Sequence, residues 1–139
     1  MTDPGIWFGV RVIAFAATVP LLLWRPVDRW GRHLTVTVRA SPPSEDSVNR
    51  LVTAIDRALR AGWPLVRTGC LTRGITMYRF LTRAGVPVSL HLGAGLVDNR
   101  FAAHCWVERH GQPVREPHDP RTIFTSMHVI TPDSAAGAA

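Results

Sequence analysis

The sequence contains no lysine, so all sixteen of its basic side chains are arginines. Set against ten acidic residues, they give a formal net charge of +6. Arginine suits bidentate recognition of carboxylates and phosphates, which makes an acidic peptide or a nucleic acid a candidate partner. The arginines are scattered along the chain, however, and no nucleic-acid-binding module is recognisable. The composition therefore favours a solvated basic surface and predicts no nucleic-acid partner.

Cysteine is also scarce, because the chain has only Cys70 and Cys105. Two cysteines do not make the disulfide framework of a small secreted domain. Neither belongs to a C-x-x-C pair, and the nearby histidines His104, His110 and His118 do not have the spacing of metal ligands. We therefore expect no metal and no other cofactor.

The N-terminal part of the chain is apolar. Residues 5–24 contain only Arg11 and Thr18 as polar interruptions, and the stretch has neither a basic region before it nor an A-x-A cleavage site. Arg11 within the stretch and Pro20 near its end disfavour a membrane-spanning helix. We expect residues 1–30 to form a helical segment that docks on a partner or lies on a membrane surface. The protein is expected in the cytoplasm, with association at a membrane surface as the alternative.

Two amphipathic helices are predicted in the middle of the chain. Ser44 is a typical N-cap residue, and apolar residues recur with helical spacing from Val48 to Leu59. A second helix is predicted from about Cys70 to Ala84, directly before Gly85.

Strands dominate the second half of the sequence. Alternating or β-branched residues predict strands in the segments 33–39, 86–92, 101–110 and 123–130, the last of which could instead form a helical turn. Residues 93–100 are predicted to be a turn-rich connection, and residues 111–112 a hairpin turn. Helices followed by strands indicate an α+β fold with a small antiparallel sheet. We expect this domain to span residues 31–131, followed by a disordered tail at 132–139.

Cys70 lies at the start of the second helix, directly after Gly69. Unpaired backbone N–H groups and the positive end of the helix dipole stabilise a thiolate at this position, and the thiolate is the nucleophilic form of cysteine. The same N–H groups can stabilise the oxyanion of a tetrahedral intermediate. Taken alone, a small buried cysteine is the commoner explanation, so the functional interpretation requires a base.

The predicted strand 101–110 supplies that base. Side chains alternate along a strand, so His104 and Trp106 share one face while Cys105 points to the other. A histidine within reach of a helix-start cysteine forms the Cys–His pair of acyl-transfer enzymes. We therefore predict that Cys70 is the nucleophile and His104 its general base, and that Cys105 belongs to the core.

A third residue should orient the imidazole of His104 through its other nitrogen. Glu116 and Asp119 both follow the predicted hairpin. An antiparallel return strand brings Glu116 back beside His104 more naturally than a turn brings Asp119, so Glu116 is preferred. Glu108 shares the face of His104 but lies four residues along the strand, which is too far to orient the ring.

The same residues resemble a known family, the transglutaminase-like cysteine peptidases of lasso peptide biosynthesis, which form the leader-peptidase part of the B protein. The similar segments are CLTRGITMYRFLTRAGVPVSLHLGAG (70–95) and FAAHCWVERHGQPVREP (101–117). The family pattern has a Cys-Leu-x-Arg helix start and a His-Ala-Trp-Val-Glu strand followed by a glycine-containing hairpin. The chain departs from it with Cys105 where alanine is usual and Gly74 where alanine or serine is commoner.

The resemblance implies a papain/transglutaminase-like fold with the nucleophilic cysteine at a helix N-terminus. Cys70 and His104 match the nucleophile and base of the family, and Glu116 falls where the family places its acid, usually aspartate. Trp106 and Arg73 of the motif are expected to bind substrate.

The implied activity is removal of the leader from a ribosomally made lasso precursor peptide. A separate leader-binding protein is the implied partner, and the macrolactam-forming cyclase is a further one. Two alternatives stay open. The first is a transglutaminase-like acyltransferase, and the second is a non-catalytic basic module that binds a peptide, a membrane or a nucleic acid.

Overall fold

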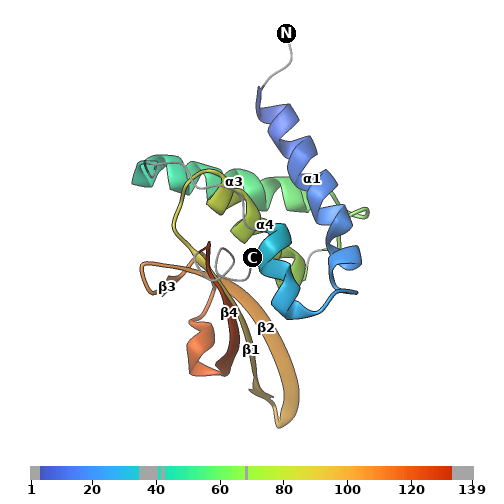
Figure 1. The fold of residues 1–139 in the computed structure, drawn as a ribbon, viewed down its shortest axis with the longest axis vertical. Coiled ribbons are helices and arrows are strands. Elements are labelled where there is room, and N and C mark those ends of the chain that lie inside the picture. The colour runs from blue at the N-terminus through green and yellow to red at the C-terminus, as the bar shows by residue number, and fades with distance from the viewer. Residues whose placement is uncertain (1–3, 35–40, 42, 68, 133–139) are drawn as a thin grey trace.

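The structure is a computed structural model, and it describes residues 4–34, 41, 43–67 and 69–132. Helices come first: α1 (Pro4–Leu22), η1 (Val27–Arg29), α2 (Trp30–Leu34), α3 (Glu45–Ala61) and α4 (Cys70–Arg83). Strands follow: β1 (Ser89–Val97), β2 (Arg100–Arg109), β3 (Gln112–Pro113) and, after η2 (Pro120–Thr122), β4 (Phe124–Ile130). Figure 1 shows the helices gathered at one end of the molecule and the β1–β2 hairpin projecting from the other. This order confirms the predicted α+β fold.

Local sequence signals explain both central helices. Ser44 caps α3, because its side chain accepts a hydrogen bond from the backbone N–H of Ser47. α4 begins at Cys70, as predicted, and ends before Gly85, whose φ of 84° belongs to the left-handed region that glycine adopts without strain.

The sheet is antiparallel with strand order β3-β2-β1-β4. The sequence predicts a connection at residues 93–100, but β1 continues to Val97 and the turn consists of Asp98 and Asn99 alone. A Cβ on Gly93 would lie 2.8 Å from the ring of Trp106, so this glycine permits a close approach within the strand instead of marking a turn. The segment 123–130 forms a strand and not a helical turn.

Two of the sequence predictions fall wholly or partly outside the described residues. His33 and Leu34 of the predicted strand 33–39 belong to helix α2, and the remainder of that segment, 35–39, is not described. The predicted tail is likewise outside the described residues from position 133 onward.

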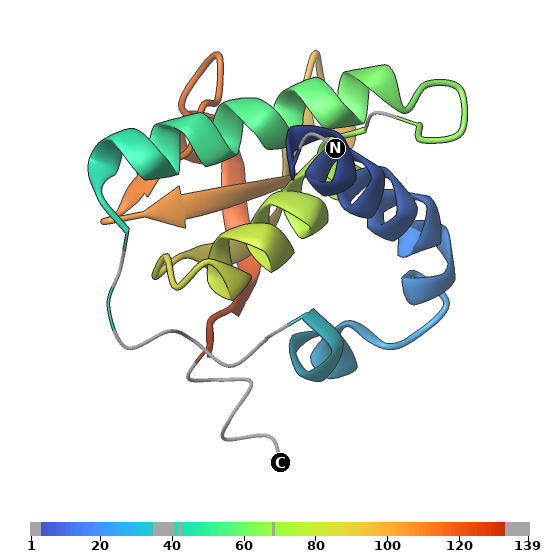
Figure 2. The same ribbon diagram turned by 90° about the horizontal axis from the view of Figure 1, so that it is seen from above.

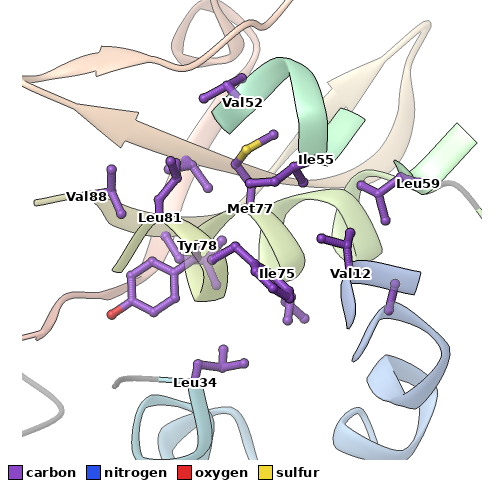
Figure 3. Close-up of a cluster of buried hydrophobic side chains, with 14 of the residues drawn as sticks. Val12, Leu34, Val52, Ile55, Leu59, Ile75, Met77, Tyr78, Leu81 and Val88 are labelled. Atoms are coloured by element: carbon purple, nitrogen blue, oxygen red, sulfur yellow. The ribbon is translucent and has the colours of Figure 1, made fainter. Parts of the chain in front are cut away.

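α4 lies between the sheet and the other helices, since it contacts β2 and β1 as well as α1 and α3 (Figure 2). Figure 3 shows buried side chains of four helices meeting around it: Val12, Leu34, Val52, Ile55, Ile75, Met77, Tyr78 and Leu81. Complete burial of one such side chain stabilises the fold by roughly 1.5–3 kcal/mol. The core therefore fixes α4, and with it Cys70, relative to the sheet.

α1 has two apolar faces. Val12, Ala16 and Val19 are buried against α3 and α4, whereas Ile6 and Trp7 are exposed on the opposite side. Residues 5–22 have a mean hydropathy of 1.8 and the length of a membrane span, a test that core helices and signal sequences also pass. One face of α1 is thus part of the core, and the other is uncovered among the described residues.

Candidate active site

No side chain among the residues that the structure describes caps the N-terminus of α4. Its first intrahelical hydrogen bond runs from the Arg73 N–H to the carbonyl of Gly69, which leaves the N–H groups of the first turn, including that of Cys70, without a partner in the helix. Gly69 provides no capping side chain, and the first turn contains no acidic residue, in contrast to the start of α3. The exposed thiol of Cys70 therefore lies at an uncompensated positive helix end.

His104 is half-buried on β2 between two aromatic rings. Its ring stacks on Trp106, with centroids 5.9 Å apart, and on Phe124, with centroids 5.2 Å apart. Its Nε2 atom lies 3.2 Å from Oε2 of Glu116, at hydrogen-bond distance. Because Glu116 occupies Nε2, the other ring nitrogen, Nδ1, is the one that remains for a nucleophile.

Glu116 is held from its other side by Arg73. Its side chain is only 9% exposed, and its Oε1 atom lies 3.5 Å from a guanidinium nitrogen of Arg73. Arg73 also donates to the carbonyl of Arg115 at 3.4 Å. Since Arg73 stands one helical turn after Cys70, it ties the loop that carries Glu116 to the start of α4.

Asp56 completes this ion-pair network. Its two carboxylate oxygens accept hydrogen bonds from Arg73 at 2.8 and 3.2 Å. Sequence reasoning did not identify Asp56. The available signal was that Asp56 is the one acidic residue of α3 beyond the first turn, but the helical spacing could not show that it faces Arg73.

Among the described residues, no hydrogen bond joins Cys70 to His104, and the helix that begins at Cys70 packs on Cys105, the chain neighbour of His104. Cys105 neighbours His104 on β2 and is buried against Gly74 of α4, one turn after Cys70. Burial raises the pKa of the Cys105 thiol strongly, as expected for a cysteine of the core. Catalytic hydrogen bonds often tighten only when a substrate is bound.

Asp119, the second candidate acid, lies elsewhere. It accepts hydrogen bonds from the backbone and side chain of Arg121 and caps the short helix η2. Of the two candidates, the structure brings Glu116 and not Asp119 to His104.

The substrate-binding role expected for Trp106 does not fit its position. Its side chain is 1% exposed, and its indole N–H donates to Glu108 at 2.9 Å. Its ring also stacks on His91, at 5.4 Å between centroids. A buried ring offers a substrate almost no surface, so Trp106 supports the ring of His104 instead. Arg73, also expected to bind substrate, is already engaged by carboxylates of the protein itself.

A cleft of about 540 Å³ opens beside the nucleophile candidate. It is lined by Asp56, Leu59, Arg60, Gly69, Cys70, Arg73 and Arg115. This volume falls within the usual range of ligand sites. His104 is not one of the lining residues, so the cleft approaches Cys70 from the side of α3. Within the described part of the chain, no group of three or more His, Cys, Asp or Glu side chains is arranged to hold a metal ion.

Comparison with known proteins identifies the superfamily of the chain. A family model described as the transglutaminase-like superfamily matches residues 11–129, from within α1 to the last strand. Neither the curated proteins nor the solved structures gave a match.

Proposed function

Because the chain belongs to the transglutaminase-like superfamily, we propose that it is a cysteine peptidase that forms an acyl-enzyme on Cys70. This superfamily is typically a cysteine-based enzyme fold with peptidase or acyltransferase chemistry. The observation that carries the proposal is the 3.2 Å contact between His104 and Glu116, which Arg73 links to the helix that begins at Cys70.

In the first half of the reaction, the thiolate of Cys70 attacks the carbonyl carbon of a peptide bond. Unpaired N–H groups at the start of α4 stabilise the negative oxygen of the tetrahedral intermediate. His104, protonated by the thiol and held by Glu116, then gives its proton to the departing amine. The products of this half are a thioester on Cys70 and a free amine.

In the second half, His104 takes a proton from a water molecule, which attacks the thioester. The carboxylate product leaves, and the thiol of Cys70 recovers its proton. An amine in place of water would complete an acyl transfer instead, so both outcomes use the same residues.

The finer proposal is that the substrate is the leader of a lasso precursor peptide. It is supported by the Cys-Leu-x-Arg and His-x-Trp-Val-Glu motifs of the sequence, which lie at the start of α4 and along β2. We propose a separate leader-binding protein as partner, with the cyclase as a further one. The uncovered face of α1 is the candidate docking surface, and we place the protein in the cytoplasm.

The decisive experiment incubates the parent chain and a Cys70→Ala variant with a candidate precursor peptide and its leader-binding protein. We expect the parent to release leader and core fragments whose summed mass exceeds that of the precursor by one water, and Cys70→Ala to release none. Cys105→Ala serves as the matched cysteine control and should retain cleavage. Products that join two substrates would identify an acyltransferase, and alkylation of Cys70 at pH 6 no faster than that of a free thiol would favour the non-catalytic module.

The docking proposal has its own test. Removing α1 would also remove Val12, Ala16 and Val19 from the core, so deletion cannot separate docking from folding. Substituting Trp7→Ser on the exposed face leaves the core untouched. It should weaken binding of the partner without changing the thermal stability of the chain, and unchanged binding would exclude this face.

A further inference from the structure

The side chains that line the cleft beside Cys70 include more positive than negative charges. Three arginines and one aspartate line it. Arg73 and Asp56 neutralise each other through two short hydrogen bonds, and the remaining contact of Arg73 is with Glu116. The positive charge available to a ligand therefore belongs to Arg60 and Arg115.

Arg60 lies in the last turn of α3 and is exposed. No hydrogen bond or ion pair joins its guanidinium to any residue that the structure describes. Arginine presents a planar set of donors that matches a carboxylate bidentately. An arginine at the wall of a cleft, free of internal partners, is thus suited to bind an anionic group of a ligand.

Arg115 is held at the cleft by its backbone. Its φ of 48° lies in the left-handed region, which costs a non-glycine residue free energy and is most often retained at functional sites. The carbonyl of Arg115 accepts a hydrogen bond from Arg73 at 3.4 Å, and its guanidinium donates to the carbonyl of Asn49 at 3.3 Å. Within the described chain its charge has no acidic counterpart.

These contacts place the two arginines against different parts of α3, because Asn49 lies near its start and Arg60 in its last turn. Figure 2 shows α3 running along the length of the helical layer and ending at the connection that leads to α4. Arg60 and Arg115 therefore line the cleft at two different places, and Cys70 is another of its lining residues.

On the basis of the proposed peptidase function, we infer that this cleft binds an acidic side chain of the peptide substrate close to the scissile bond, with Arg60 and Arg115 supplying the positive charge that attracts its carboxylate. A carboxylate gains charge-assisted hydrogen bonds there. A lysine or arginine of a peptide would be repelled, which adds discrimination against basic sequences. The acids already present do not oppose this, because Arg73 compensates Asp56 and contacts Glu116.

The charge of the cleft can be measured without any peptide. Iodoacetate and iodoacetamide both alkylate a thiolate with loss of iodide, and they differ in that only iodoacetate carries a carboxylate next to the reacting carbon. We expect the ratio of their rate constants at Cys70 to exceed the ratio for free cysteine by about tenfold at low salt. The excess should shrink as salt is added, because exposed charges are screened.

Variants assign this effect to the two arginines. Arg60→Gln and Arg115→Gln should each lower the rate ratio at least twofold, and the double variant should lower it further than either single variant. Arg57→Gln is the matched control, because Arg57 is an exposed arginine of the same helix that does not line the cleft. A ratio that none of the variants changes would overturn the inference.

Peptides then separate the inference from the proposed function. The peptides are pairs of precursors that carry either Glu or Gln at one position within three residues of the scissile bond. At one of these positions, we expect the Glu peptide to be cleaved with a kcat/KM about tenfold higher than that of the Gln peptide. This difference should disappear in the double variant Arg60→Gln/Arg115→Gln. Peptides with an amidated C-terminus test whether the cleft binds the terminal carboxylate of the peptide instead of a side chain. If the preference for Glu is lost when the C-terminus is amidated, the role of a side chain is contradicted. Equal cleavage of the Glu and Gln peptides overturns only the inference. If the parent cleaves no peptide while iodoacetate is still favoured, the proposed peptidase fails and the anion-binding cleft stands.

Discussion

Arg73 and Glu116 join two parts of the chain that are 43 residues apart, with a guanidinium nitrogen 3.5 Å from a carboxylate oxygen. The second oxygen of the same carboxylate lies 3.2 Å from Nε2 of His104. Arg73 follows Cys70 by one helical turn, so a single carboxylate connects the proposed base to the helix of the proposed nucleophile. This arrangement makes the role of each residue testable on its own.

The charge of Glu116 should matter more than its shape. Glu116→Gln keeps the volume but cannot stabilise an imidazolium, so we expect kcat/KM to fall about 100-fold or more. Glu116→Asp keeps the charge on a shorter side chain and should retain at least ten times the activity of the Gln variant. Thermal unfolding of both variants controls for misfolding. A fully active Glu116→Gln variant would remove this residue from the mechanism.

Arg73 should contribute to stability as well as to the site. Arg73→Gln leaves the carboxylates of Asp56 and Glu116, with side chains 20% and 9% exposed, without their cation. We expect a loss of about 2 kcal/mol in the free energy of unfolding, measured by denaturant titration. Arg83→Gln, at an exposed position in the last turn of the same helix, should change it by no more than about 0.5 kcal/mol. If Arg73→Gln lowers the free energy of unfolding no more than Arg83→Gln does, the ion-pair network does not stabilise the fold.

The open N-terminus of α4 predicts an effect of adding a cap. Gly69 has an extended backbone, and a Cβ added to it would meet no atom beyond its chain neighbours within 4 Å, so aspartate fits there without strain. Gly69→Asp should raise stability by a few tenths of a kcal/mol, because its carboxylate accepts from the free N–H groups. The added negative charge should also slow alkylation of Cys70 at pH 6 several-fold.

The start of α3 provides the comparison for Gly69→Asp. Ser44→Ala removes an existing cap, and it should cost about 1 kcal/mol without changing the alkylation rate. If Gly69→Asp leaves the alkylation rate of Cys70 unchanged, the helix N-terminus does not act on the thiol.

Gly74 and Cys105 should show strong energetic coupling. A Cβ on residue 74 would lie 2.7 Å from Sγ of Cys105, so Gly74→Ala should destabilise the protein although alanine favours helices by about 1 kcal/mol. Replacing Cys105 by alanine removes the clashing sulfur. We therefore expect Gly74→Ala/Cys105→Ala to be more stable than Gly74→Ala, with a coupling energy of about 1–2 kcal/mol in a double-mutant cycle. Additive effects would contradict the contact.

His91 should make the fold sensitive to acid. Burial lowers the pKa of His91 against an opposing effect of Glu108, with a smaller lowering by Arg121. Because the unfolded chain then binds a proton more readily than the native protein, stability should fall as the pH drops below the ordinary histidine value of about 6.5.

His91→Gln should reduce this loss, which can be measured as the difference in the free energy of unfolding between pH 7.5 and pH 5.5. Between pH 7.5 and 8.5 His91 is neutral in both states, so parent and variant should have the same pH dependence there. An unchanged acid response in the variant would show that His91 stays hydrated in the native state.

Several features of this protein follow from local sequence. The Ser44 cap, the apolar spacing of α3, the helix start at Cys70 and the alternation along β2 are each encoded within a few residues, and the structure agrees with them. The same alternation separates His104 from Cys105, because neighbouring strand residues point to opposite faces. These local rules, together with the motif resemblance, were sufficient for the fold class, and the roles of Cys70 and His104 that they indicate stay predictions.

Other features depend on distant contacts. The glycines of β1 suggested a turn, yet Gly93 is required by the ring of Trp106 on the neighbouring strand. The choice between Glu116 and Asp119 depends on which carboxylate reaches His104, and the burial of Trp106 depends on how the sheet packs. The pairing of Arg73 with Asp56 joins two helices whose sequences specify only their own faces. Hydrogen bonds and ion pairs act over a few ångströms in space, and only the packing of α3, α4 and the sheet brings these residues within that range.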